Sequence, residues 1–554
     1  MKIFIIFAFL AAVFRFWQIG SQPSGLYWDE LDTGYQSYSL LHTGRDYFGD
    51  PFPAHLHSFA DYRSGLYMYL TVPWISLLGM TVMSVRITAA VFSVISLFFF
   101  FYLAYHWLHL GKYSWVSVMV AAFAPWLLIQ GRIAAESTLV VPFLLLGLIG
   151  FLEFIKNGRY LWLASLGFGL TLWSYGTAKV FLPIFILVLI LIHWHRFRNL
   201  KLEVRNFILP VILFILICLP VVYETVFGHI GLRVGELSVF TDPTTQSEVN
   251  YQRLEAALGS GKTRQVGMQP TLIEKIVFNK ISSWGTVLIG NYSRALSTTF
   301  LFLKGDPELR HNLNEPNTGQ FYLVELLPFI LGLFYVFRSY FMNHKSRLLL
   351  FWLLVSPLPS VFTRDGGTHG PRLLFMFPVL VFIISLGIAF LLRKKSVRLI
   401  YFTIYMLSVC LTGYYFFTIY RVNSSSHFNT GFIPAVRLAL KQSVNYDRVI
   451  LDAHNENALM AYLFVSRFPP AVFQKSFPLP SEDLSPGISG YRFGNIDILY
   501  PGTRDWSRIS LKGHNLVISS ADQPDIGSVS PLFTIKNPDD TNSFVAFKSL
   551  SKTP

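Results

Sequence analysis

The sequence predicts an all-α polytopic membrane protein of about eleven transmembrane helices, followed by a soluble α/β domain at its C-terminal end. Composition indicates the membrane class, because 53% of the 554 residues are hydrophobic and only 14% are charged. A soluble domain carries about 25% charged residues. The apolar residues also gather in long runs, whereas residues 421–554 are more polar and carry only short apolar stretches. We therefore predict a membrane domain over 1–420 and an extracytoplasmic domain over 421–554.

Apolar runs of nearly the length that a helix needs to cross a bilayer, about 20 residues, recur along the membrane domain. They cover 3–19, 83–106, 115–130, 138–155, 160–174, 178–194, 206–223, 322–338, 348–362, 373–392 and 398–420. The first run follows Lys2 as in a signal peptide, but aromatic residues continue to Trp17 and no small-residue cleavage site follows. We interpret it as a retained transmembrane helix. Two shorter aromatic segments, 64–79 and 281–303, predict helices that lie in the outer interface of the membrane.

Clusters of Lys and Arg follow alternate predicted helices, and they indicate the orientation of the chain. Lys156, Arg196 and Lys345 each belong to such a cluster. The positive-inside rule places these clusters in the cytoplasm, together with the N-terminus. The other side then carries a first loop within 20–80, a long loop over 224–321 and the C-terminal domain.

The net charge of +14, from 45 Lys and Arg against 31 Asp and Glu, does not predict a nucleic-acid partner in a chain of this class. Cations collect on cytoplasmic loops and at lipid headgroups. Two cysteines, Cys218 and Cys410, each lie inside an apolar run. A disulfide framework is therefore not expected.

The C-terminal domain alternates short apolar strands with a helical segment. Two stretches predict strands, "DRVILDA" at 447–453 and "HNLVISS" at 514–520. Between them, "ENALMAYLFVS" at 456–466 has helical spacing. This alternation predicts a small α/β domain.

The outward loops carry an unusual mixture of carboxylates and cations. The stretch "GLYWDELDTGYQ", directly after the first helix, holds Asp29, Glu30 and Asp32, and Arg63 follows in the same loop. Later outward loops hold further candidates: Arg132, Glu136, Tyr175, Lys179, Asp306, Arg310, His311, His369 and Arg372. Arg and Lys hold a lipid phosphate through charge-assisted hydrogen bonds, and a carboxylate takes the proton of a hydroxyl nucleophile. The mixture suits transfer of a group from a lipid phosphate to a hydroxyl, with cations stabilising the departing phosphate.

Four stretches of the membrane domain carry a family resemblance. They are "YWDELDTGYQSYSLLHTGRDYFGDPFP" with the following "YRSGLYMYL", then "SVRITAAVFSVISLFFFFYLA", "APWLLIQGRIAAEST" and "GPRLLFMFP". In this order they resemble the first extracytoplasmic loop, the second helix, the next outward turn and the start of a late helix of the GT-C glycosyltransferases. The most similar branch is that of the protein O-mannosyltransferases and aminoarabinose (lipid A) transferases, of glycosyltransferase family 39 type. The resemblance covers about 20–400 and implies the GT-C fold.

This resemblance implies an enzyme of the bacterial inner membrane. Such enzymes move a sugar from a polyprenyl-phosphate carrier to a hydroxyl acceptor outside the cytoplasm, with inversion at the anomeric carbon. The resemblance implies that Asp29 is the catalytic base and that Arg63 contacts the carrier phosphate. The family has Lys or His followed by two prolines where this chain has "RSGL". We expect no obligatory cofactor, and no metal at His55 and His57, which lack evident further ligands.

Structural roles compete with several of these assignments. Asp29 could cap a helix that begins at Glu30. Glu136 could stabilise the start of a helix and pair with Arg132 four residues earlier. Glu30 and Glu136 stay candidate catalytic residues beside Asp29, and the remaining charged and aromatic groups stay candidate substrate ligands.

A transporter or flippase for an anionic lipid or solute is the main alternative function, because it would use the same cations. Transporters show inverted repeats and broken helices near mid-membrane, and the sequence shows neither. A non-catalytic binding protein that works through 421–554 would leave the carboxylates of the first loop unexplained. The sequence leaves open which sugar is moved and whether a protein, a lipid or a glycan accepts it.

Overall fold

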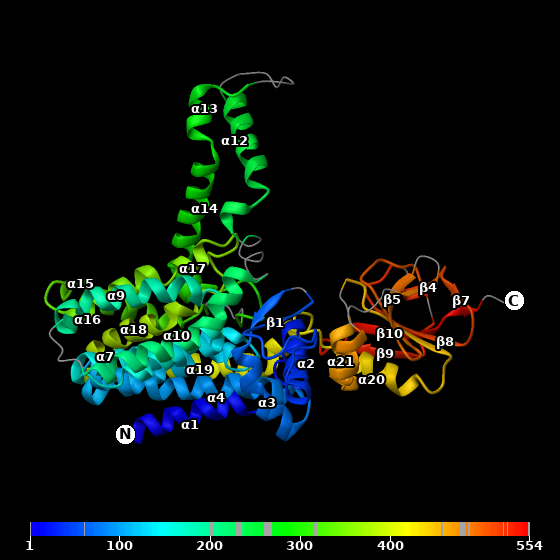
Figure 1. Ribbon diagram of the computed structural model, residues 1–554, viewed down its shortest axis with the longest axis horizontal. Helices are drawn as coiled ribbons and strands as arrows, with labels where there is room; N and C mark the ends of the chain where they lie inside the picture. The colour runs from blue at the N-terminus through cyan, green and yellow to red at the C-terminus, as the bar shows by residue number, and fades with distance from the viewer. Residues whose placement is uncertain are drawn as a thin grey trace. The chain divides into compact units, whose positions relative to one another are not determined.

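The computed structural model describes residues 2–59, 61–198, 203–228, 235, 238–259, 269–313, 318–455, 458–476, 482–485, 488–524, 526–528 and 530–551. The chain forms two compact units. The first unit comprises Met1–Ala8, Ile95–Leu127 and Ser137–Met406, and the second comprises Phe9–Val94, Leu128–Glu136 and Leu407–Pro554. Figure 1 labels the helices and strands of both units.

The first unit is a bundle of apolar helices. They are α5 (Trp115–Phe123), α7 (Val140–Asn157), α8 (Leu161–Ser174), α9 (Ala178–Arg198), α10 (Val204–Phe227), α15 (Leu326–Arg338), α16 (His344–Val355), α17 (Leu358–Val361) and α18 (Phe377–Leu391). The short helix α6 (Pro125–Gln130) begins in this unit and ends in the second. Of the residues in the apolar window of α18, 83% are buried, against 17% in α10. A helix that is apolar on every side must be covered by protein or by lipid. Protein covers α18, and the exposed apolar side chains of α10 suit contact with lipid tails.

All eleven predicted spans lie largely in helical segments, although 115–130 and 348–362 are each divided between two helices. Six of these segments are long and apolar enough to cross a membrane in the described part of the chain: Val82–Trp107, Glu136–Asn157, Ala178–Arg198, Val204–Phe227, Leu374–Leu391 and Lys395–Asn423. The predicted span 115–130 is instead divided into α5 and α6. Ala124 leaves the helical conformation (ψ 125°) before Pro125, which begins the next helix. The number of transmembrane spans stays a prediction.

The two segments predicted to lie in the membrane interface are helical. α3 (Leu66–Leu78) continues through Pro73, and α14 (Lys280–Ala295) is followed by a π-helical turn at Thr299–Leu303. α14 packs beside α12 (Thr245–Gly259), and Figure 1 shows the two helices running side by side. Their location relative to a membrane stays a prediction.

In the N-terminal part of the second unit, α2 (Trp28–Thr43) is largely buried. An antiparallel hairpin of β1 (His55–His57) and β2 (Tyr62–Ser64) precedes α3, which packs against α2. α1 (Lys2–Phe16), α4 (Val82–Tyr102) and α19 (Lys395–Asn423) each contribute residues to both units.

The C-terminal part of the second unit is a mixed sheet with helices, as predicted. Its strands, in spatial order, are β4 (Glu482–Ser485), β5 (Ile488–Phe493), β6 (Ile496–Leu499), β3 (Arg448–Asp452), β8 (Asn515–Ser520), β10 (Asn542–Lys548) and β9 (Phe533–Lys536). β3 runs parallel to both β6 and β8, and the other pairs are antiparallel. The predicted strands are β3 and β8, and the predicted helix is α21 (Leu459–Ser466). Two residues of that predicted helix, 456–457, lie outside the described residues.

Close packing between α2 and α21 joins the two parts of the second unit. Gly34 of α2 faces Phe464 of α21, where a Cβ atom on Gly34 would overlap the Phe464 ring. The Tyr35 hydroxyl donates to the Phe468 carbonyl at 3.1 Å. In α22 (Pro470–Ser476), Gln474 Nε2 donates to two hydroxyls and one carbonyl of the α2 region. The helix that carries Asp29 is therefore held by the C-terminal domain.

Candidate functional site

Glu30 and Arg86 form a buried bidentate ion pair at the start of α2. Both residues are fully buried. Arg86 Nε and Nη2 each lie 2.7 Å from one carboxylate oxygen of Glu30. The guanidinium also donates to the carbonyl oxygens of Pro23 and Gly25, each at 2.7 Å. This pair fixes the first turn of α2 against α4 and orders the chain before it.

Arg63 of the β1–β2 hairpin lies between two further carboxylates. Its Nη1 is 3.0 Å from Asp32 Oδ2, and its Nη2 is 2.7 Å from Glu136 Oε1. Nη1 also donates to the backbone carbonyl of Asp29 at 2.8 Å. The hairpin, α2 and the turn before α7 thus meet at one guanidinium.

The charges of this cluster influence one another strongly. Burial lowers the pKa of Arg63, but the surrounding carboxylates outweigh burial and raise that pKa well above its usual value. Burial raises the pKa of Asp32, against the opposing effects of Arg63 and of the Tyr47 hydroxyl, which donates to Asp32 Oδ1 at 2.7 Å. One cation thus faces several carboxylates.

Asp29 differs from Glu30, Asp32 and Glu136 in having an exposed side chain. α2 begins at Trp28 with Tyr27 as its N-cap, so the alternative that Asp29 caps a helix beginning at Glu30 is wrong. Asp29 lies in the first turn, and its side chain is exposed. In the described residues, no hydrogen-bond donor contacts its carboxylate. This carboxylate is therefore open to a ligand from solution.

Arg132 is held by backbone carbonyls near the end of α1. It is fully buried, and its guanidinium donates to the carbonyls of Phe14, Trp17 (2.8 Å) and Gln22 (3.0 Å). Its guanidinium carbon also lies 4.8 Å from the centre of the Phe416 ring. These contacts give Arg132 a structural role, since they surround it with protein. Its predicted contact with substrate stays a prediction.

A second group of predicted residues meets in the first unit. Asp306 is buried, and its Oδ2 accepts hydrogen bonds from His311 Nδ1 (2.9 Å) and from the backbone N–H of Gly370 (2.7 Å). The His311 and His369 rings lie 4.9 Å apart between centroids. Burial raises the pKa of Asp306, but the His311 and backbone contacts outweigh burial and lower it. Asp306 thus joins the loop at 304–312 to the loop at 363–372.

The two predicted arginine ligands of these loops have neighbours in their own loops. Arg372 Nη1 donates to Thr363 Oγ1 at 2.9 Å, and Arg310 Nε donates to Glu308 Oε1 at 3.0 Å. Arg310 and Glu308 are both partly exposed. The role of Arg372 and Arg310 at a carrier phosphate stays a prediction.

Tyr175 and Lys179 flank the short turn between α8 and α9. Tyr175 follows the last residue of α8 with extended backbone (φ −156°, ψ 143°), and Lys179 lies in the first turn of α9. Both side chains are half-buried. Their predicted contact with substrate stays a prediction.

Asp306, His311 and His369 are also able to hold a metal ion, which the sequence did not indicate. Their ligand atoms all lie within 4.8 Å of one another. Burial, with the nearby charges of Arg372 and His311, lowers the pKa of His369 to about 3, so its ring is neutral at physiological pH. Neutral imidazole and carboxylate suit zinc. Asp306 is already hydrogen-bonded by protein groups, so the same three residues also connect the loops without an ion.

Sequence reasoning gave no site role to Tyr47 or Arg86, and it named Asp32 only as one carboxylate of the first loop. Arg86 is a charged residue within an apolar run, and such residues usually face a buried partner. That signal could have identified it. Tyr47 gives no comparable signal, because its contact with Asp32 depends on how the first loop folds back.

Comparison with solved structures shows the fold. The chain is similar to ArnT from Cupriavidus metallidurans bound to undecaprenyl phosphate, with 12% identity, a TM-score of 0.51 and 99% of each chain covered. It is also similar to the archaeal oligosaccharyltransferase AglB from Archaeoglobus fulgidus, in complex with an inhibitory peptide and a dolichol-phosphate. There the identity is 12%, the TM-score is 0.46, and 84% of this chain and 63% of that chain are covered. No protein-family model and no curated protein sequence matches the chain. Together with its apolar helices, the first likeness shows an integral membrane protein with the predicted fold of the GT-C glycosyltransferases.

Proposed function

We propose that this chain is a membrane glycosyltransferase that moves a sugar from a polyprenyl-phosphate carrier to a hydroxyl acceptor outside the cytoplasm. The fold supports the proposal, because ArnT shares it and was solved with undecaprenyl phosphate bound. The apolar outer helices support it as well, since a carrier of this kind reaches the protein through the membrane. The distribution of Lys and Arg supports an outward-facing site.

The free carboxylate of Asp29 is the observation that carries this proposal. Glu30 is bound to Arg86, and Asp32 and Glu136 are bound to Arg63. A general base must reach the proton that it removes. Of these four carboxylates, Asp29 alone is exposed and lacks a hydrogen-bond donor in the part of the chain that the structure describes.

The proposed step is an inverting displacement. The acceptor hydroxyl oxygen attacks the anomeric carbon from the face opposite the phosphate, and Asp29 takes the hydroxyl proton. The bond between the anomeric carbon and the phosphate oxygen breaks, and the carrier phosphate leaves with the electron pair. The step needs no redox partner, and a positioned base accelerates such a proton transfer by about 10²–10⁴-fold.

The neighbouring ion pairs position Asp29. Arg86 holds Glu30, the next residue, and Arg63 holds the backbone carbonyl of Asp29 itself. A displacement of a catalytic group by about 1 Å can slow the reaction about 10²-fold. These contacts fix the first turn of the helix, so they hold the Asp29 carboxylate in place. Arg63 already donates to protein oxygens of Asp29, Asp32 and Glu136, and its predicted contact with a carrier phosphate would use its other N–H donors.

Native mass spectrometry of the protein purified in mild detergent tests the proposal. We expect wild-type protein to carry a lipid with the mass of a polyprenyl phosphate or its sugar-linked form. We expect Asp29→Asn protein to accumulate the sugar-linked form, because donor binding precedes proton removal. Asp50→Asn is the matched control, since Asp50 is another exposed carboxylate of the same loop.

The result that would overturn the proposal is folded protein with no polyprenyl lipid in either variant. A transporter or flippase would then be the better hypothesis. Reconstituted vesicles would distinguish it, because a flippase moves an anionic lipid across the bilayer without changing its mass.

A further inference from the structure

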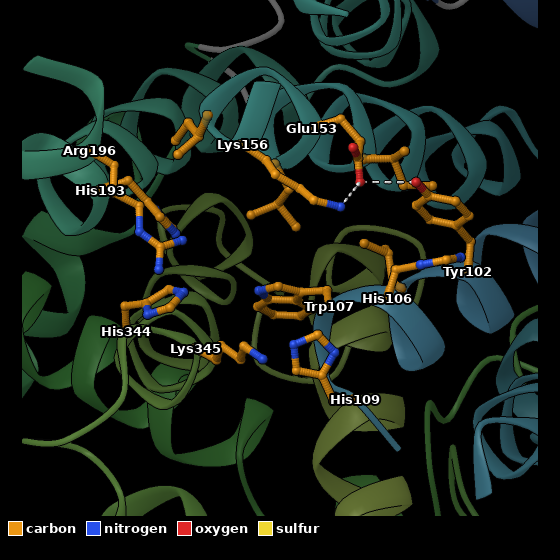
Figure 2. Close-up of a pocket in the computed structure, with 14 residues that line it drawn as sticks. Tyr102, His106, Trp107, His109, Glu153, Lys156, His193, Arg196, His344 and Lys345 are labelled. Carbon is orange, nitrogen blue, oxygen red and sulfur yellow. Dashed lines mark hydrogen bonds and ion pairs between the residues drawn. The ribbon is translucent and has the colours of Figure 1, made fainter. Parts of the chain in front are cut away.

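A pocket in the first unit is lined by an excess of basic side chains. Its volume is about 320 Å³, and it lies among the π-helical turn at Leu103–Trp107, the end of α7, the end of α9 and the start of α16 (Figure 2). Its basic lining residues are His106, His109, Lys156, His193, Arg196, His344 and Lys345. By the positive-inside rule, this is the side of the membrane predicted to be cytoplasmic.

The acidic residue of the lining, Glu153, forms an ion pair with Lys156, at one side of the pocket. Glu153 Oε1 accepts a hydrogen bond from the Tyr102 hydroxyl at 3.0 Å and lies 3.9 Å from Lys156 Nζ, as Figure 2 shows. Its other oxygen accepts from Asn157 Nδ2 at 3.0 Å. Within the described ranges, no carboxylate forms an ion pair with Arg196 or Lys345.

Two buried ring nitrogens of the lining also lack partners. Trp107 is 7% exposed and His193 is 3% exposed. His193 Nδ1 bonds to the Leu189 carbonyl at 3.1 Å, whereas His193 Nε2 and Trp107 Nε1 have no hydrogen-bond partner in the described part of the chain. Trp107 lies in the middle of the view in Figure 2, with Lys156, Lys345 and His109 around it. Trp107 Nε1 is a donor, and a buried donor without a partner costs free energy. A ligand acceptor would remove that cost.

Cations gathered at a partly buried site repel one another, and a bound anion offsets this repulsion because each cation attracts it. Lys and Arg are the usual phosphate ligands of proteins, and Arg adds bidentate geometry. Basic pockets between transmembrane helices on the cytoplasmic side bind anionic lipid headgroups. The volume is also within the range of ligand pockets, about 300–1,000 Å³. Arg196 and Lys156 are exposed at the surface, so a ligand can reach the pocket.

We propose that this pocket binds a phosphate group, carried either by an anionic lipid headgroup or by a small soluble phosphate. Arg196 and Lys345 bind the phosphate oxygens, and Trp107 Nε1 donates the remaining hydrogen bond. The proposal does not depend on glycosyl transfer.

Thermal unfolding in detergent tests this site, with separate arms for the two sources of phosphate. One arm compares added phosphatidylglycerol with phosphatidylcholine, and the other compares sodium phosphate with sodium chloride at equal ionic strength. The variants are Arg196→Gln and Lys345→Gln. The controls are Arg159→Gln and Lys112→Gln, which remove exposed cations of the same predicted side outside the pocket.

We expect one phosphate-bearing ligand to raise the Tm of wild type and of both controls, and to raise the Tm of Arg196→Gln and Lys345→Gln less. A response confined to phosphatidylglycerol assigns the site to a lipid headgroup, and a response to sodium phosphate assigns it to a soluble phosphate. Equal responses in all variants, or no response in either arm, would overturn the proposal. Native mass spectrometry of the same samples provides a second readout. If the ligand is a lipid, we expect it to be bound to wild type and to both controls and to be lost from Arg196→Gln and Lys345→Gln.

Discussion

At the scale of single residues, the neighbouring carboxylates Asp29, Glu30 and Asp32 differ in the groups that contact them. Glu30 is paired with Arg86 inside the protein, and Asp32 is buried against Arg63. Asp29 is exposed with an unoccupied carboxylate, as far as the described residues extend. Neighbours in sequence therefore have different tasks, because successive residues of a helix point in different directions.

Glu30→Gln should lower stability much more than Asp29→Asn. Removing one partner of a buried ion pair leaves the other charge uncompensated, which costs about 3–5 kcal/mol. Asp29 is exposed, and its carboxylate has no hydrogen-bond donor among the described residues, so its loss should leave the Tm close to that of wild type. Thermal unfolding of both variants in one detergent checks this difference. If Glu30→Gln keeps the Tm of wild type and loses all activity, Glu30 would instead be assigned to catalysis.

Arg63→Lys should distinguish positioning from phosphate binding. Lysine keeps the charge but cannot hold two carboxylates and a carbonyl with the same fork of donors. If Arg63 positions Asp29, the variant should lose transfer rate while retaining carrier binding. Kinetics with varied donor concentration separate the two effects. A large rise in KM with unchanged kcat would favour the phosphate role.

At the scale of elements, the sequence predicted the apolar helices of the membrane domain but only two of the strands, β3 and β8, because long apolar runs are the strongest local signals. β3, β8 and α21 lie where their patterns predict them. Local chemistry also explains the main difference, since Pro125 separates α5 from α6 within one apolar run. The site contacts were not predictable in this way. Arg86 and Glu30 are 56 residues apart, and no pattern in the sequence pairs them.

Gly34→Leu should separate α2 from α21. A side chain at Gly34 would overlap the Phe464 ring, and overpacking of this kind typically costs about 1–3 kcal/mol. The expected result is a lower Tm and easier proteolysis between α2 and the C-terminal domain. The control is Gly176→Ala, which should leave the Tm unchanged because a Cβ atom on Gly176 would meet open space. Gly49 does not serve as a control, because its φ of +104° would strain an alanine. Equal Tm values for Gly34→Leu and Gly176→Ala would contradict the packing described.

Asp306→Asn should loosen the contact between the loops at 304–312 and 363–372. The variant loses the charge-assisted bond to His311 while keeping a similar shape. We expect a lower Tm that is the same with and without a chelator, because protein groups already satisfy Asp306. The contrary result is a wild-type Tm that falls when a chelator is added while the Tm of Asp306→Asn does not change. That result would show that Asp306, His311 and His369 hold a metal.

At the scale of the whole molecule, the fold is the part of the prediction that was most secure. Composition predicted a membrane protein, the order of motifs implied the GT-C fold, and the likeness to ArnT confirms that fold. The sugar and the acceptor could not be predicted, because they depend on the detailed shape of a site and not on the pattern of apolar residues. Of the predicted site, Asp29 is exposed and its role as the base stays a proposal, whereas Glu30, Arg63 and Arg132 are engaged within the protein.

The most direct test of the central claim measures consumption of the donor. Host membranes that contain wild type, Asp29→Asn or Asp50→Asn would be sampled over time, and mass spectrometry would follow the conversion of polyprenyl-phosphate sugar to free polyprenyl phosphate. We predict that wild type and Asp50→Asn consume the donor at similar rates, and that Asp29→Asn is slower by about 10²-fold or more. Donor consumption by folded Asp29→Asn at the wild-type rate would contradict the assignment of Asp29 as the base.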